Sequence, residues 1–283
     1  MKKLNEFREQ LISGEASKDD WLNFKKVASQ NFDSLPTYLK LYLADLKHIE
    51  ATGISKSEIV ILDHGCGSGV TVLFLLANGY TKVFGVDPKT HKYKNLNKNL
   101  SELTGEVTRP FLTYLPDNKI ELATGTVNYI FSNQVMEHLS DEDLVSFLTE
   151  EQRLKSEISI IRHSFPTRNT FFETHTKTII LHWLLNRSLF NRMFSEKKKE
   201  WLEQNLFLRW DNLYEKAFTQ IVGSLYQENT ARIDYSLENF AEGKAKSMIR
   251  ALFHAFMEVP IFQPFLKLIY RNFATKEFVQ RNL

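Results

Sequence analysis

The sequence predicts an α/β fold: a doubly wound, mostly parallel sheet with N-terminal helices and a helical insertion after the fifth strand. Three observations predict it. Short β-rich runs alternate with helical stretches between residues 57 and about 165. The first run, Ile59 to Leu62, is continuously apolar, as in a strand that is covered on both faces. A glycine-rich turn at residues 63–69 then connects this strand to a helix.

Hydrophobic periodicity gives the elements of the core in order. We expect strands at 59–62, 83–86, 127–131 and 158–161, a further strand within 107–114, and helices at 70–78, 89–101 and 141–156. The last of these helices is expected to face inward with Leu144, Val145, Phe147, Leu148 and Leu154.

The chain on either side of this core has a different residue pattern, with mainly helical signals. Residues 1–56 predict a helical extension, in which one helix begins near Asp19-Asp20 and another follows Pro36 and ends near Gly53. Residues 166–283 predict a helical insertion and a C-terminal region, with a short strand near 277–280. We therefore expect three parts: the extension 1–56, a ligand-binding core 57–165, and a region 166–283 that forms a pocket or lid over the core.

Composition excludes several classes of protein. The 36 Lys and Arg residues balance 34 Asp and Glu residues, which disfavours sequence-independent binding of nucleic acid. The single cysteine, Cys66, excludes an intramolecular disulfide framework and fits a reducing compartment. With neither a secretory signal nor an apolar run long enough for a membrane span, we expect a cytoplasmic protein.

The apolar and aromatic stretch 248–273 leaves three alternatives open. It would form a lid over the acceptor pocket, contact a partner subunit, or lie on a membrane surface. The sequence does not specify the oligomeric state.

The turn at residues 63–69 has the chemistry of a nucleotide-binding loop. Glycines let a ligand approach the backbone, and the helix that begins near Val70 offers unpaired N–H groups. Asp87, at the end of the next strand, suits a bidentate hydrogen bond to ribose hydroxyls. The Asp63 carboxylate would repel a pyrophosphate but would receive an ammonium group. This pattern favours S-adenosylmethionine (SAM) over a dinucleotide as the ligand. The alternatives without a ligand are that the loop is only a structural turn and that Asp87 caps a helix.

The segments VILDHGCGSG (60–69), VFGVDP (83–88) and VNYIFSNQVMEHL (127–139) resemble class I SAM-dependent methyltransferases. The resemblance implies a Rossmann-like fold, SAM as cofactor and S-adenosylhomocysteine (SAH) as product. It implies that the glycine loop lines the methionine end of SAM, that Asp87 binds the ribose, that Pro88 and either Asp117 or Asn118 approach the adenine, and that Ser132 and Asn133 lie near the reacting methyl. The loop residues concerned are Asp63, Gly65, Cys66, Gly67 and Gly69, with Cys66 interpreted mainly as a small filler.

Methyl transfer to a hydroxyl needs a base, and histidine is the first candidate. Glu137-His138 follows the fourth strand and would either act on the acceptor or stabilise its own segment. Some quinone-biosynthesis relatives bind a divalent metal here with an additional glutamate, where this chain has Gln134. Because an amide is a weaker ligand, we predict no metal.

A second candidate group lies in HSFPTRNTFFETHTKTIILHWL, residues 163–184. The segment is similar to one in methyltransferases thought to modify glycans, with Thr174 in place of a proline. Glu173 and His175 would be a base and its orienting partner, and Trp183 would stack on a ring; His182 is a less favoured candidate. The alternative is a helix that begins near Glu173, with Trp183 in the core.

We therefore expect a SAM-dependent methyltransferase that acts on a hydroxyl of a small molecule or glycan intermediate. One alternative is a methyltransferase fold that serves as a binding subunit without turnover. Another is an RNA or protein methyltransferase, although Ser132-Asn133-Gln134-Val135 replaces the Asn-Pro-Pro-Tyr type of motif used for base N-methylation.

Overall fold

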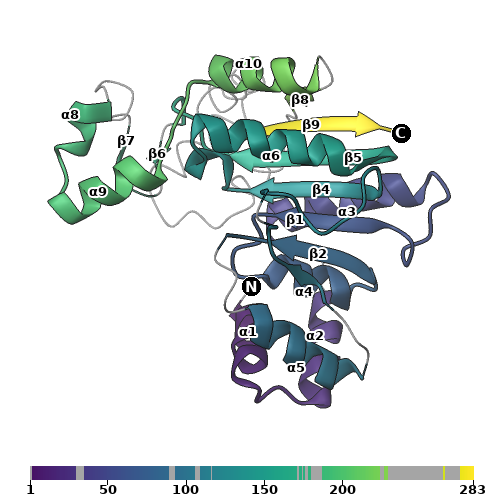
Figure 1. Ribbon diagram of the computed structural model, residues 1–283. Helices are drawn as coiled ribbons and strands as arrows, with labels where there is room; N and C mark the ends of the chain where they lie inside the picture. The colour runs from purple at the N-terminus through teal and green to yellow at the C-terminus, as the bar shows by residue number, and fades with distance from the viewer. Residues whose placement is uncertain are drawn as a thin grey trace. The chain divides into compact units, whose positions relative to one another are not determined.

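The computed structural model describes residues 2–29, 35–88, 93–105, 109–115, 117–170, 172–173, 175, 178–179, 187–223, 226–228, 264 and 275–283 (Figure 1). The chain divides into two compact units. The first comprises Met1–Ser132, Ser146–Arg162 and Gln280–Leu283, and the second comprises Asn133–Val145 and His163–Val279.

A parallel sheet forms the centre of the first unit. Strand β1 (Val60–His64) pairs with β2 (Lys82–Val86) on one side and with β4 (Val127–Asn133) on the other, and β2 pairs with β3 (Phe111–Leu112). The hydrogen-bonded order of the whole sheet is β3-β2-β1-β4-β5-β9-β8. The expected α/β fold with a mostly parallel sheet is thereby confirmed. Parallel order also brings the carboxyl ends of β1, β2 and β4 to one edge, where such sheets bind ligands.

Helices connect these strands as the periodicity predicts. Helix α4 (Val70–Ala77) is almost entirely apolar and buried, which explains its weak amphipathic signal. Helix α5 (Tyr93–Thr104) precedes β3, and α6 (Asp141–Leu154) precedes β5 (Lys155–Phe165). One inward position was predicted wrongly: Val145 is exposed, because the buried stripe of α6 runs through Leu144, Phe147 and Leu148.

Three N-terminal helices belong to the first unit: α1 (Lys2–Ser13), α2 (Lys18–Ser29) and α3 (Thr37–Glu50). Phe7 of α1 stacks with Trp21 and Phe24 of α2, which joins these two helices through an aromatic cluster. Arg8 of α1 donates a hydrogen bond to the carbonyl oxygen of Ser68 (3.4 Å). The extension therefore touches the glycine loop itself.

The second unit combines short helices with short strands. Its helices are α8 (Arg187–Asn191), α9 (Glu196–Asn205) and α10 (Asp211–Val222). The expected helix start near Glu173 is wrong: β6 (Phe172–Glu173) and β7 (Thr178–Ile179) form an antiparallel pair. β-branched residues in and around this pair favour an extended chain.

Strand β8 (Tyr226–Glu228) lies within the stretch expected to be helical. The predicted C-terminal strand is confirmed as β9 (Lys276–Asn282). The stretch 248–273 lies outside the described residues except for Pro264. Within the part of the chain that the structure describes, no helix has both the length and the apolar composition to cross a membrane.

Candidate active site

The glycine loop is tied to the end of β2 by backbone groups and by Asp87. The N–H groups of Gly65 and Cys66 both donate to the carbonyl oxygen of Val86, at 2.8 and 3.0 Å. The N–H of Gly67 donates to Asp87 Oδ2 at 3.1 Å. Asp87 thus already holds the loop, and its half-buried carboxylate lies at the carboxyl end of β2, where we predict a ribose contact.

Gly69 closes the loop and caps helix α4. Its φ of 78° lies in the left-handed region, which glycine adopts without steric cost. A Cβ at this position would lie 2.5 Å from Cε1 of Phe111. The loop therefore needs glycine here both for its backbone conformation and for the packing of β3.

Asp63 is buried at the end of β1, and its electrostatic surroundings oppose its charge. Burial, and secondarily the nearby Asp87 carboxylate, raise the pKa of Asp63 well above its ordinary value. A cationic ligand group would relieve both effects, because it would pair with the carboxylate in a site that excludes water. The ammonium group of SAM has the charge that this position favours.

Cys66 packs inside the loop. The thiol is buried, lies 3.4 Å from the Tyr93 hydroxyl, and has a pKa raised mainly by burial and then by Asp63. A Cβ on Gly85 would lie 2.8 Å from Cys66 Sγ, so the sulfur fills the space that this glycine leaves. These observations favour a packing role over a reactive thiol.

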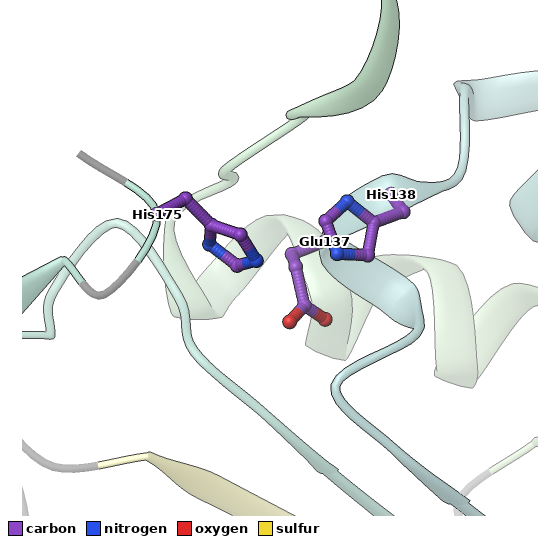
Figure 2. Close-up of side chains that lie close together, drawn as sticks. All are labelled: Glu137, His138 and His175. Atoms are coloured by element: carbon purple, nitrogen blue, oxygen red, sulfur yellow. The ribbon is translucent and has the colours of Figure 1, made fainter. Parts of the chain in front are cut away.

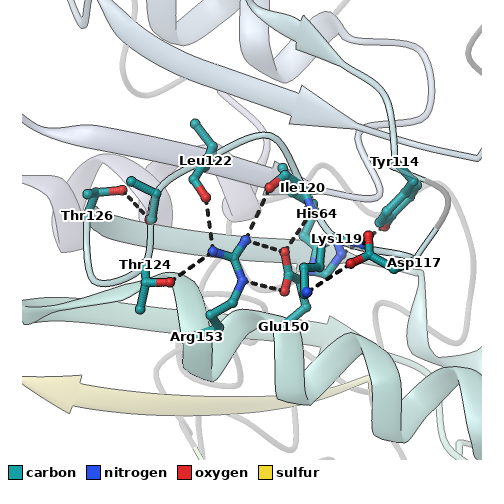
Figure 3. Close-up of polar contacts among 11 residues, drawn as sticks. His64, Tyr114, Asp117, Lys119, Ile120, Leu122, Thr124, Thr126, Glu150 and Arg153 are labelled. Atoms are coloured by element: carbon teal, nitrogen blue, oxygen red, sulfur yellow. Dashed lines mark hydrogen bonds and ion pairs between the residues drawn. The ribbon is translucent and has the colours of Figure 1, made fainter.

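His64 forms a buried network that the sequence did not indicate, and Figure 3 shows its partner Tyr114. Its Nδ1 lies 2.8 Å from Glu151 Oε1, its Nε2 lies 2.8 Å from the Tyr114 hydroxyl, and its ring stacks on Phe147 with centroids 3.5 Å apart. Burial, and then the charge of Glu151, raise the pKa of Tyr114, so this hydroxyl keeps its proton. Through Glu151 and Phe147, this network fixes His64, the residue after Asp63, to helix α6.

Arg153 of α6 holds the loop that carries Asp117 (Figure 3). Its guanidinium donates to the carbonyl oxygens of Ile120 (3.1 Å) and Leu122 (3.0 Å), while Glu150 accepts from the N–H of Ile120 at 2.7 Å. Asp117 itself is exposed and pairs with Lys119 at 2.8 Å, and a hydrogen bond with Lys119 lowers its pKa. Its predicted adenine contact stays a prediction.

The end of β4 places polar groups at the carboxyl edge of its sheet. Ser132 is buried, and the buried Oδ1 of Asn133 accepts no hydrogen bond from the described residues. Gln134, with φ 57°, turns the chain after the strand and donates its N–H to the carbonyl oxygen of Ser164 (2.7 Å). A non-glycine residue in this conformation is strained, as is common beside functional sites.

Three side chains that were predicted in two separate segments come together in the second unit (Figure 2). Glu137 and His138 lie on the 3-10 helix η2 (Met136–His138), and His175 lies between β6 and β7. One ligand-type atom of each residue lies within 4.8 Å of the other two. Glu137 is fully buried, while both histidines are half-buried, so the group is partly open to solvent.

Backbone groups at the end of α9 hold η2 in place. His138 Nδ1 lies 2.5 Å from the carbonyl oxygen of Asn205, and the Phe207 N–H donates to the Glu137 carbonyl oxygen at 2.6 Å. A carbonyl oxygen only accepts hydrogen bonds, so Nδ1 carries the proton and, in the neutral ring, Nε2 carries the lone pair. Figure 2 shows the rings of His138 and His175 on the two sides of the Glu137 carboxylate.

Trp201 of α9 forms an aromatic wall beside this group. Its ring centroid lies 6.3 Å from that of His138 and 5.9 Å from that of His175. Sequence reasoning missed Trp201, because only the fold of the second unit brings α9 beside the histidines. Of the other candidates, His182 and Trp183 lie outside the described residues, and only the backbone of Glu173 is described.

Residues 61–156 match the family model of the methyltransferase domain. The match coincides with the sheet and glycine loop described above, and with the segments that resemble class I enzymes. This part of the chain is therefore similar to a methyltransferase domain, and SAM is the ligand that its glycine loop and Asp63 favour. No curated protein sequence matches the chain at a significant level.

Solved structures of methyltransferases resemble the chain at low identity. Phosphoethanolamine N-methyltransferase 2 of Haemonchus contortus is 16% identical with a TM-score of 0.48, over 97% of this chain and 60% of that one. Geranyl diphosphate C-methyltransferase of Streptomyces coelicolor is 13% identical with a TM-score of 0.46, over 89% and 86%. A putative sarcosine dimethylglycine methyltransferase of Galdieria sulphuraria is 12% identical with a TM-score of 0.47, over 90% and 91%. At these values the likenesses identify no acceptor.

Proposed function

We propose that the protein transfers the methyl group of SAM to a hydroxyl of a small molecule or a glycan intermediate. The methyl of a sulfonium is already activated, so the protein mainly has to align and desolvate the two reactants. A hydroxyl acceptor also has to lose its proton, and this need assigns a task to the group Glu137, His138 and His175.

The carboxylates of the first unit support SAM as the donor. Asp63 lies at the end of β1 and Asp87 just after the adjacent strand β2, and the Asp87 charge adds to the cost of ionising the buried Asp63. SAM brings an ammonium group for the first and ribose hydroxyls for the second, whereas a pyrophosphate would add negative charge beside both.

The strongest support for a hydroxyl acceptor is the hydrogen bond between His138 Nδ1 and the Asn205 carbonyl oxygen. It fixes the tautomer in which Nε2 can accept a proton, and the buried Glu137 carboxylate next to it would stabilise the imidazolium that results. The Trp201 face provides an apolar surface against which a sugar or another ring would stack.

Substitution of His175 tests the role of this group toward the acceptor, because the His175 ring lies beside that of His138, with centroids 4.8 Å apart. We expect His175→Ala to lower kcat roughly 100-fold, the usual scale of acid–base contributions, with nearly unchanged affinity for SAM. Asp87→Ala is the matched contrast, and should weaken SAM binding instead. Calorimetry with SAM and transfer of label from methyl-labelled SAM to a panel of hydroxyl acceptors separate the two effects.

Three results would contradict the proposal. If His175→Ala loses SAM affinity and turnover equally, the residue has no separate role toward the acceptor. If the wild-type chain binds SAM and methylates amines or nucleic acid but no hydroxyl, the acceptor class is wrong. A chain that binds SAM and never turns over would instead be a binding subunit with a methyltransferase fold.

A further inference from the structure

Glu137, His138 and His175 have the composition of a metal-binding set. Two imidazoles and one carboxylate provide three ligands, and this combination leaves one or more positions of an ion open for water or substrate. The three ligand-type atoms lie within 4.8 Å of one another. We propose that this group binds a divalent transition-metal ion of the zinc type.

The hydrogen bond of His138 prepares that residue as a ligand. Histidine ligands usually donate the other ring N–H to a carbonyl or carboxylate oxygen, which fixes the ring and its tautomer. Here Nδ1 donates to the carbonyl oxygen of Asn205 at 2.5 Å, so the lone pair of the neutral ring lies on Nε2. The Asn205 carbonyl oxygen at the end of α9 therefore orients the His138 ring, as hydrogen-bond acceptors orient histidine ligands in metal sites.

The surroundings favour charge neutralisation. Glu137 is fully buried, and a carboxylate in such a place is stabilised by a cation. Its backbone is held independently by the hydrogen bond from the Phe207 N–H to its carbonyl oxygen. Trp201 supplies an apolar wall at 5.9 and 6.3 Å from the two histidine rings, which limits access of solvent to an ion.

The ligand types decide which ion fits. Imidazole suits zinc and similar transition metals, whereas magnesium prefers an octahedron of oxygens. Bonds of about 2.1 Å in a tetrahedral site place two ligand atoms about 3.4 Å apart, so an ion would draw the three side chains together.

This inference reverses the expectation drawn from Gln134. That residue is exposed in the structure and lies outside the group, so its amide does not weaken the site. The third ligand comes from His175, 37 positions after His138, which sequence spacing did not indicate. An ion here would occupy the Nε2 lone pair of His138, so it would replace the histidine as the group that activates the acceptor: it would bind the acceptor hydroxyl and lower the pKa of that hydroxyl. This catalytic use of the ion rests on the proposed function, but the binding of the ion does not.

Titration of tag-free, chelator-treated protein with Co²⁺ tests the site. We expect one equivalent to bind with the visible ligand-field absorption of a low-symmetry site, and Zn²⁺ to displace it. His175→Ala, His138→Ala and the near-isosteric Glu137→Gln should each weaken Co²⁺ binding at least about 100-fold, since loss of even outer groups costs 10–100-fold. His48→Ala is the matched control, because His48 is exposed on α3 and outside the group.

Absence of Co²⁺ binding by the wild-type chain would overturn the inference, and so would undiminished binding by His175→Ala. Circular dichroism melting of each variant shows whether a loss reflects unfolding. His175 is half-buried on a hairpin, so its variant keeps the test valid even where Glu137→Gln fails to fold. Stoichiometric Co²⁺ binding without methyl transfer would contradict the proposed function alone.

Discussion

Replacing Asp63 with asparagine is expected to stabilise the ligand-free protein while it weakens SAM binding. Because the folded protein raises the pKa of Asp63, it binds more protons than the unfolded chain between the two pKa values, and stability falls as pH rises through that interval. Above that interval Asp63→Asn should gain about 1 kcal/mol, or roughly 2–4 °C in Tm. Loss of the charge-assisted contact should weaken SAM about ten- to hundredfold.

The pH dependence of binding gives a further readout. Wild-type affinity for SAM should decline as pH falls, because the ammonium group needs the charged form of Asp63, and Asp63→Asn should lack this slope. Asp19→Asn, at an exposed position of α2, is the control that should change neither quantity. A variant that binds SAM like the wild type, or that melts lower, would refute the role assigned to Asp63.

Removal of the Arg162 guanidinium is expected to have the largest effect on stability. Arg162 and Asp45 are buried, with Nε and Nη2 of the arginine 2.5 and 2.9 Å from the two carboxylate oxygens. Arg162→Met would leave the Asp45 carboxylate buried, with the Tyr129 hydroxyl and the more distant Arg281 as its partners among the described residues. Such changes cost about 3–5 kcal/mol, and thermal melting should fall by about 10 °C.

A second substitution separates the ion pair from simple packing. Asp45→Asn combined with Arg162→Met removes both charges and keeps an acceptor for Tyr129, so it should recover part of the loss. Lys98→Ala, which removes an exposed ion pair with Glu102, should have no measurable effect. Equal melting temperatures for Arg162→Met and the wild type would show that the pair does not stabilise the fold.

Local signals predicted most of the first unit. A glycine loop between an apolar strand and a helix, followed by an acid after the next strand, depends on residues that are neighbours in sequence. Strands β1, β2 and β4 and helices α4 and α6 therefore lie within a few residues of the predicted ranges. The main local error was Val145, where apolar character was given more weight than its position on the helical face.

Interactions between distant residues could not be predicted in this way. His64 meets Glu151 across 87 positions, and Asp45 meets Arg162 across 117. The group of Glu137, His138 and His175 also depends on the hairpin β6–β7, whose two-residue strands carry no clear periodicity. Histidine was recognised as a candidate in each segment, but only the fold shows that the two segments share one site.

Calorimetry of the full chain with SAM, SAH and NAD⁺ tests the central claim most directly. All three ligands contain an adenosine moiety, but SAM and SAH bring an ammonium group to Asp63, whereas NAD⁺ brings a pyrophosphate. The account predicts one binding site for SAM and SAH in the micromolar to millimolar range usual for enzyme substrates, and no binding of NAD⁺. Binding of NAD⁺ in preference to SAM, or no heat with either SAM or SAH, would contradict it.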